Sequence, residues 1–267
     1  MFKDITLGQY FPGDSPVHKL DPRTKIIGMI AFIIIVFFVK KVMMFLPVFL
    51  FILIATYLSR VPMSYLWKSL KPLRFILIFM FILNLFVIGT GETLWRLGPL
   101  HITTGGIRQA VFITVRLILL VSGTSLLTLT TTPIGLTDGL ELLLTPLKKV
   151  KFPAHELAMM MTIALRFIPT LMEEADKISS AQISRGADFE TGNIVKRAKA
   201  MVPVLVPLFI SAFRRADELA MAMESRCYHG GEGRTRMHVL RCGRNDFLAA
   251  CALLLLFAVV LAGGLLL

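Results

Sequence analysis

Long runs of apolar residues constrain this chain more than any other feature. A helix needs roughly 17–25 apolar residues to cross a bilayer, and five runs reach or approach that length. They are residues 26–39, which are slightly short, and residues 42–58, 75–89, 107–130 and 247–267. Hydrophobic residues make up 55% of the 267 residues, more than a water-soluble domain needs. The sequence therefore predicts an all-α polytopic membrane protein with about five transmembrane helices.

Residues 131–246 have a different pattern, which predicts one short and two long amphipathic helices. Thr132 and Pro133 resemble an N-cap and a first helical residue, and leucines follow at helical spacing. The two long helices are expected near residues 154–184 and 193–226, each apolar in its first half and charged in its second. At 1.5 Å per residue each spans roughly 45–50 Å, more than a bilayer core requires.

Hydropathy alone also allows each apolar first half to cross the bilayer, which gives seven spans in place of five. Arg166 lies in the first of these halves, and Pro203 and Pro207 interrupt the second. A five-span arrangement with a cytoplasmic N-terminus places 24 of the 29 Lys and Arg residues inside, as the positive-inside rule requires. We therefore expect an N-terminal membrane part (1–130), a cytoplasmic helical region (131–246) and a last transmembrane helix (247–267).

A gapless repeat lies within the two long helices, where residues 174–186 align with residues 215–227 and share Ala, Asp, Ala, Ser and Arg. Each copy closes on a serine, an arginine and a small residue: Ser184, Arg185 and Gly186 in the first, Ser225, Arg226 and Cys227 in the second. Arginine in a last turn also complements the helix dipole, which contributes about 0.3–1 kcal/mol, and glycine commonly caps a helix. Dipole capping does not explain the shared Ala-Asp. The repeat favours docking to two copies of a partner, or to a two-fold symmetric one.

The sequence lacks the motifs of several other functions. It contains no GxxxxGK[ST] phosphate loop, no HExxH, no GxSxG and no paired CxxC, so we expect no catalytic residue, metal or cofactor. His229, His238 and Cys242 are spaced irregularly and are interpreted as a polar loop. The net charge of +12 follows from membrane topology, and no nucleic acid is expected as a partner. Arg116, within a predicted span, either has a functional role, or snorkels or pairs inside the helix bundle.

Several segments together resemble the transmembrane T component of energy-coupling factor (ECF) transporters, a branch of the ABC importers. The similarity covers the N-terminal run 8–25, the segment 132–148, the run Leu165–Pro169 and the paired arginine motifs, which makes it nearly full length. Ser184 stands where that family often has Ala, and Cys227 stands where it often has Gly. Both replacements are small, so the docking expectation is retained.

The resemblance implies a non-catalytic scaffold in the cell membrane. Two ATP-binding ABC ATPase subunits would each receive one arginine tip, and a substrate-binding membrane S component would rest on the apolar halves of the long helices. The residues expected to form that platform, or to contact lipid, are Leu157, Met160, Ile163, Leu205 and Phe209. Family members carry vitamins or transition-metal ions such as nickel or cobalt. The alternative is a self-sufficient secondary carrier or a membrane-embedded enzyme, but only Arg116 is a mid-membrane ionisable group and no reactive cluster is evident.

Overall fold

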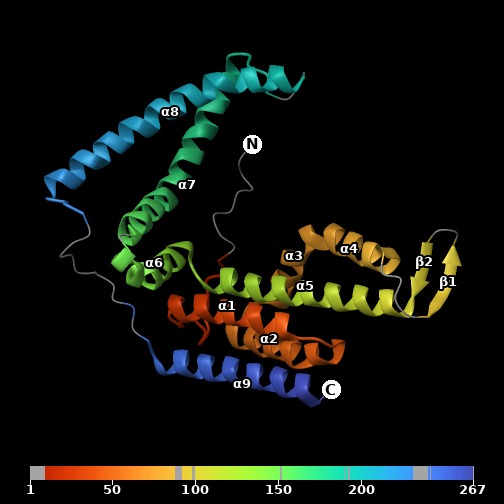
Figure 1. Cartoon of the computed structure of the whole chain (residues 1–267). Helices are drawn as coiled ribbons and strands as arrows, with labels where there is room; N and C mark the ends of the chain where they lie inside the picture. The colour runs from red at the N-terminus through yellow and green to blue at the C-terminus, as the bar shows by residue number, and fades with distance from the viewer. Residues whose placement is uncertain are drawn as a thin grey trace. The chain divides into compact units, whose positions relative to one another are not determined.

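The computed structural model is predominantly α-helical (Figure 1). It describes residues 10–87, 92–97, 100–150, 152–189, 191, 193–230, 240 and 242–266. The α-helices are α1 (Pro22–Phe38), α2 (Phe45–Ser59), α3 (Met63–Leu70), α4 (Arg74–Val87), α5 (Thr104–Thr130), α6 (Pro133–Leu144), α7 (Ala154–Ser184), α8 (Ile194–Ser225) and α9 (Arg244–Leu266). Short 3-10 turns occupy Val42–Met44, Lys71–Leu73 and Thr145–Val150. The predicted helical class is confirmed.

The chain separates into two compact units. The membrane unit comprises the described residues of 10–140 and 240–266, and the paired-helix unit comprises those of 141–230. The division falls inside α6, between Leu140 and Glu141. Each unit has its own packing and its own polar contacts.

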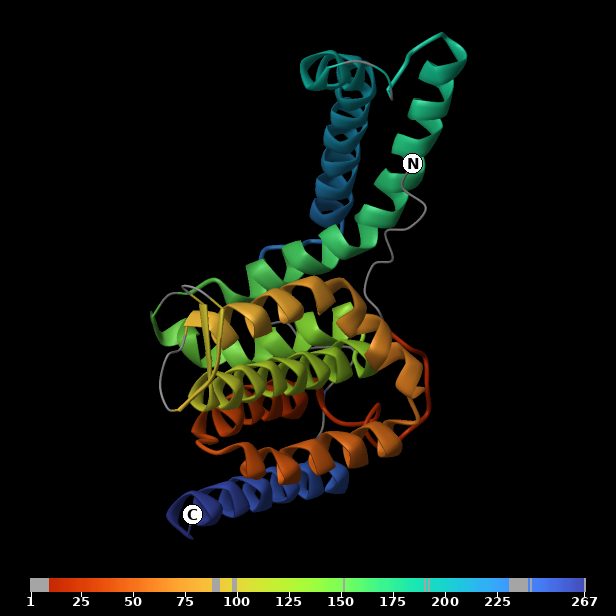
Figure 2. The same ribbon diagram turned by 90° about the vertical axis from the view of Figure 1, so that its right-hand side faces the viewer.

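Helices α1, α2, α5 and α9 lie side by side in both views of the membrane unit (Figures 1 and 2). Helix α1 begins where Asp21 Oδ1 accepts a hydrogen bond from the backbone N–H of Arg23 at 2.9 Å, with Pro22 as the first helical residue. A turn of six residues then leads to α2. The buried core joins apolar side chains from all four helices: Phe32, Ile35, Val36, Val39, Met44, Phe45, Val48, Ile52, Leu119, Leu256 and Val260.

Four helical stretches among the described residues are long and apolar enough to cross a membrane: Val42–Ser59, Met63–Val87, Thr104–Thr130 and Arg244–Gly264. The first expected span is α1, which has only 17 residues. At 1.5 Å per residue it covers about 26 Å, somewhat less than a bilayer core of roughly 30 Å. Neither α7 nor α8 is among these four stretches.

The segment between α4 and α5 contains a short hairpin where we expected only a polar loop. Strands β1 (Thr93–Leu97) and β2 (Leu100–Thr103) pair antiparallel, with Trp95 opposite Ile102. Helix α5 follows at once because Thr103 Oγ1 accepts a hydrogen bond from the N–H of Gly106 at 3.1 Å. Gly89, expected at the end of the third span, lies outside the described residues.

A polar network that the sequence pattern did not predict ties together the ends of α1, α5 and α9. Lys25 Nζ donates to the carbonyl oxygens of Thr130 at 2.8 Å and His18 at 3.2 Å, and to Thr131 Oγ1 at 3.1 Å. The buried Asp246 carboxylate, on α9, accepts from the N–H of Asp21 at 2.8 Å. Buried polar groups need such partners, so these contacts fix where α1 and α9 begin.

In the paired-helix unit, α7 has 31 residues and α8 has 32. Both match their predicted ranges to within a residue at each end. Interior prolines occur in both helices, at Pro169 in α7 and at Pro203 and Pro207 in α8. The expected start of the short helix α6 is also confirmed, because Thr132 Oγ1 accepts from the N–H of Gly135 at 3.1 Å.

Candidate interaction site: the paired helix ends

The first helix tip, Ser184–Gly186, is a Schellman-type cap. The N–H of Ala187 donates to the carbonyl of Gln182 at 2.9 Å, and the N–H of Gly186 donates to the carbonyl of Ile183 at 2.9 Å. Gly186 adopts a positive φ of 88°. This is the hydrogen-bond pattern that commonly satisfies the last carbonyls of a helix, with glycine in the left-handed position.

The second tip, Ser225–Cys227, repeats this geometry 41 residues later. The N–H of Tyr228 donates to the carbonyl of Met223 at 3.0 Å, and the N–H of Cys227 donates to the carbonyl of Glu224 at 2.8 Å. Cys227 takes the left-handed place of Gly186, with φ 57°. A residue with a Cβ costs roughly 1–2 kcal/mol more than glycine in that conformation. The sequence repeat is therefore also a repeat of backbone geometry.

The serines of the two tips also behave alike. Ser184 Oγ donates to the carbonyl of Ser180 at 3.1 Å, and Ser225 Oγ donates to the carbonyl of Met221 at 2.6 Å. Each hydroxyl thus bonds back to the residue four positions earlier, as serine often does within a helix. These bonds leave the following arginine as the group that each tip presents.

Arg185 and Arg226 are both exposed, and each is the last half-helical residue before its cap. Within the part of the chain that the structure describes, neither guanidinium makes a hydrogen bond or an ion pair. A guanidinium presents a planar fork of donors that suits carboxylates and carbonyls of another molecule. The two tips are therefore equivalent basic ends that remain available for a partner.

The crossing of α7 and α8 relates the two tips to each other. Arg215 Nη2, on α8, lies 3.1 Å from Glu174 Oε2, on α7, and these two residues are the equivalent first positions of the repeat. Equivalent positions of two copies meet only near a two-fold axis. Each tip arginine lies 11 residues beyond its own crossing residue, which is about 16 Å along each helix. Figure 1 shows the two helices running in roughly opposite directions, so the tips lie at opposite ends of the pair.

The carboxylate at this crossing is held in its charged form. A hydrogen bond from Ser211 lowers the pKa of Glu174 below its ordinary value of 4.5, and the positive charge of Arg215 lowers it further. The crossing is thus a charged contact at neutral pH. No sequence signal identified Ser211 as a member of this contact.

The apolar residues proposed as a platform differ in how exposed they are. Ile163 lines a small groove of about 260 Å³ between α7 and α8, together with Phe167, Leu171 and Ala216. Leu157 is half-buried. The other three are exposed, with relative exposures of 55% for Met160, 43% for Leu205 and 61% for Phe209. These three lie on the outer surface of the helix pair, where apolar side chains mark an interaction surface or a lipid contact.

A contact near the start of α7 also left no signal in the sequence. His155 Nδ1 lies 3.0 Å from Oε1 of Glu141, at the end of α6. This pair closes the turn between the two helices. A histidine and a glutamate 14 residues apart carry no recognisable motif, so only the fold reveals the pair.

The sequence left the role of Arg116 open. In the structure its side chain has partners inside the membrane unit. Its Nη2 donates to the carbonyl of Val39, the C-cap of α1, at 2.9 Å. The guanidinium lies 4.5 Å from the ring centre of Phe112 and 5.3 Å from that of Phe37. These contacts favour the reading in which Arg116 pairs within the bundle.

Among the described residues no group of three His, Cys, Asp or Glu side chains is placed to hold a metal ion. His238, one of the three residues of the polar loop, lies outside them.

Comparison with known proteins assigns the family. The model of the family described as "CbiQ: Cobalt transport protein" matches residues 13–239. A protein of Thermosediminibacter oceani named "energy-coupling factor transporter transmembrane protein EcfT" is 56% identical over 250 residues, covering 94% of each chain. Proteins with the same name from Clostridium kluyveri, 53% identical over 98% of each chain, and Bacillus subtilis, 49% identical over 97% of this chain and 98% of its own, also match.

The apolar helices, together with these matches, place the chain among the helical membrane subunits of transporters. The chain belongs to the EcfT family of ECF transporter transmembrane proteins. Its resemblance to that family, inferred from the motifs, is confirmed.

Proposed function

We propose that this chain is the scaffold of an ECF-type importer, coupling ATP hydrolysis by two partner ATPases to the reorientation of a separate substrate-binding membrane subunit. The observation that carries the proposal is the identity of the two helix tips. Arg185 and Arg226 follow the same serine bond, precede the same cap and lie at opposite ends of one crossing. Two equivalent tips suit two equivalent partners.

The apolar halves of α7 and α8 supply the second part of the proposal. Exposed side chains such as Phe209 and Met160 would be covered by the substrate-binding subunit or by lipid. When the ATPases close on bound ATP, they would move the tips, and the helices would carry that movement to the platform. The chain itself would hydrolyse nothing and bind no cofactor.

Specificity in this arrangement lies in the substrate-binding subunit, and the imported compound is a vitamin or another micronutrient. The matched family model is described by cobalt transport, whereas the names of the relatives specify no substrate. The description of the family model and the names of the relatives are both compatible with a scaffold that makes no contact with the substrate.

The proposal places the N-terminus and the paired-helix unit in the cytoplasm, where the ATPases are. Single cysteines at Lys177 and Lys199, in a version without Cys227, Cys242 and Cys251, should resist impermeant thiol reagents in intact cells and react after lysis. Labelling of intact cells would contradict this topology.

The decisive experiment reverses both charges. In Arg185→Glu combined with Arg226→Glu, the ATPases should be lost from a detergent pull-down and uptake into vesicles abolished, with the membrane protein still inserted. Each single Ala variant should keep a detectable but poorly coupled complex, because the remaining tip still tethers the linked ATPase pair. Losing one buried, hydrogen-bonded charge costs about 2–5 kcal/mol of binding. A double variant that retains both ATPases and normal uptake would show that these arginines serve only as helix caps.

A further inference from the structure

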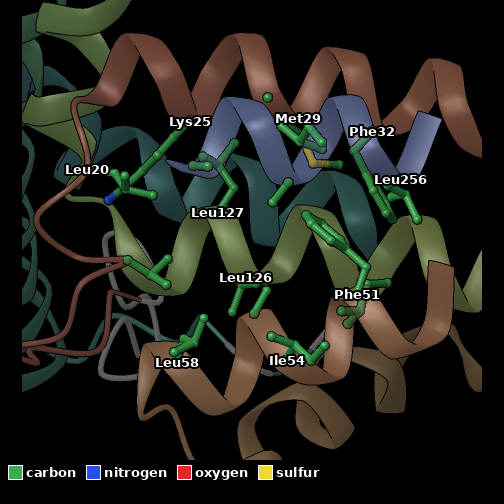
Figure 3. A pocket seen from close by; sticks show the side chains of 18 of the residues that line it. Leu20, Lys25, Met29, Phe32, Phe51, Ile54, Leu58, Leu126, Leu127 and Leu256 are labelled. Atoms are coloured by element: carbon green, nitrogen blue, oxygen red, sulfur yellow. The ribbon is translucent and has the colours of Figure 1, made fainter. Parts of the chain in front are cut away.

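The membrane unit contains a cavity of about 600 Å³ between α1, α2, α5 and α9 (Figure 3). The buried core concentrates near the turn between α1 and α2, at residues such as Val36, Phe45 and Val48. The residues that line the cavity lie further along the same helices, toward Lys25 on α1 and Leu58 on α2. The cavity is therefore a wedge that starts at this core, to which Phe32, Ile52 and Leu256 of its lining also belong, and extends between α1 and α2 away from their connecting turn.

The lining is almost entirely hydrocarbon. Its only polar side chains are Thr24, Lys25 and Thr130, and the contact of Lys25 Nζ with the Thr130 carbonyl places them at one end. The rest of the wall consists of aliphatic and aromatic side chains such as Met29, Phe51 and Leu126 (Figure 3). Apolar cavities disfavour water, which needs two to four polar partners, and they bind hydrocarbons.

One wall of the cavity remains accessible from outside the unit. Leu50, Ile54 and Leu58, all on α2, have relative exposures of 56%, 49% and 48%. They belong to one of the helices able to cross the bilayer, Val42–Ser59, so the surroundings at their level are lipid chains. The volume suits a small ligand, whereas a helix about 10 Å across and 30 Å long would not fit.

The polar end of the cavity carries the positive charge of Lys25. Lys25 Nζ makes its three hydrogen bonds to the uncharged oxygens of His18, Thr130 and Thr131. The negative charge of Asp246 acts on this ammonium group, although no carboxylate of the described residues lies within ion-pair distance of it. Because these bonds use all three N–H groups, an anion at this end would be attracted by the charge of the ammonium group without a direct hydrogen bond, and the adjoining wall would receive the chain attached to the anion.

We propose that this cavity holds one acyl chain of a membrane phospholipid, with the phosphate toward Lys25. The lipid is a resident component that fills the wedge between α1 and α2 and supports the contact of both helices with α9. This site does not involve the helix tips. A result that refutes the bound lipid would therefore leave the proposed function unaffected.

Photocrosslinking tests the proposal in the intact, detergent-purified protein. Benzoylphenylalanine replaces Leu126, which lines the cavity, or as a control Leu83, an exposed position on α4 outside it. Detergent removes loosely held lipid, so irradiation after purification should add a phospholipid mass at position 126 and not at position 83. Intact mass spectrometry reads both adducts.

Each other outcome overturns the proposal. A polypeptide adduct at position 126 would assign the cavity to a partner protein, and a free fatty acid mass would refute the phospholipid. A detergent adduct, no adduct, or equal lipid adducts at positions 126 and 83 would show that no lipid resides there.

Filling the cavity from either side gives a second measurement. Ala55→Phe on α2 and Ala252→Phe on α9 each place a ring in the cavity and should lower the lipid adduct at position 126 several-fold. Leu254→Phe is the matched control, because it lies on α9 outside the lining and is 66% exposed. An undiminished adduct in a well-folded filling variant would contradict the assigned location. The comparison of positions 126 and 83 in the otherwise unchanged chain decides the question even if a filling variant does not fold.

Discussion

Arg215 on α8 donates a hydrogen bond to Glu174 on α7, with 3.1 Å between Nη2 and Oε2. The two residues are equivalent positions of the repeat, so the ion pair marks the pseudo-two-fold axis of the helix pair. The contact therefore marks where the helices cross, and each helix extends an equal length beyond it to its tip.

The first prediction tests this crossing by exchanging its charges. Glu174→Arg places two cations together and should destabilise the pair, whereas adding Arg215→Glu restores opposite charges and should recover the loss. The contact is partly exposed, so we expect a change of about 0.2–1 kcal/mol. Thermal unfolding and the distance between spin labels at Ala181 and Ala222 would report it. If the double variant has the same thermal stability and the same spin-label distance as Glu174→Arg alone, the ion pair does not position the helices.

The same contact predicts a pH dependence. The pKa of Glu174 lies below its ordinary value of 4.5, so folding favours the ionised carboxylate. Its stabilising contribution is complete above pH 4.5 and is lost as the pH falls through the lower, folded-state pKa. The spin-label distance should therefore stay constant from pH 8 to pH 5 and change only below pH 4.5. Glu174→Gln is the control and should remove this acid transition.

The second prediction concerns the two helix caps. Cys227→Gly removes a Cβ from a left-handed residue and should stabilise the end of α8 by about 1–2 kcal/mol. The reciprocal change, Gly186→Cys, should destabilise the end of α7 by a similar amount. Hydrogen exchange at the amides of Tyr228 and Ala187, which donate the capping bonds, measures both effects. Equal hydrogen-exchange rates at these amides in the variant and the unchanged chain would show that the backbone at Cys227 is not strained.

Much of this architecture follows from the sequence because its signals are local. Apolar runs, the Thr132–Pro133 start and the repeat are read along the chain, and the helix ends they predict agree with the structure to within a few residues. The equivalence of Gly186 and Cys227 was also visible as a match between small residues. Their shared positive φ was not, because cysteine rarely adopts that conformation.

The remaining contacts depend on three-dimensional packing and left no pattern. Asp21 and Asp246 are 225 residues apart, and the three bonds of Lys25 involve backbone oxygens that no residue type marks. The crossing at Glu174 and Arg215 also required the fold, because two aligned residues need not touch. The hairpin formed by β1 and β2 escaped prediction because its strands are only five and four residues long.

The third prediction separates two roles for Arg116. Arg116→Met removes the bond to the Val39 carbonyl and the contacts with two aromatic rings, so it should destabilise the protein by about 1.5–3 kcal/mol. Arg116→Lys keeps the charge and should recover part of that loss. Uptake per correctly folded complex should remain unchanged in both. Lost uptake at unchanged thermal stability would instead assign Arg116 to the transport step.

The last prediction tests the platform by using only its exposed members. Met160, Leu205 and Phe209 are replaced together by Asp, whereas Leu157 and Ile163 are left intact because they are half-buried and Ile163 lines the α7–α8 groove. A carboxylate buried in an apolar interface costs several kcal/mol, enough to release a partner. The substrate-binding subunit should therefore be lost from the purified complex while the ATPases remain bound.

The control for this variant carries the same negative charge on the other halves of the same helices. Ser180→Asp with Met221→Asp and Ala222→Asp adds three carboxylates at exposed positions close to the tips and away from the platform. It should leave the substrate-binding subunit in place. Quantitative mass spectrometry of both complexes compares the subunit ratios. Equal recovery of that subunit in the platform variant and the control would mean that these three side chains face lipid, and that the subunit binds elsewhere on the scaffold.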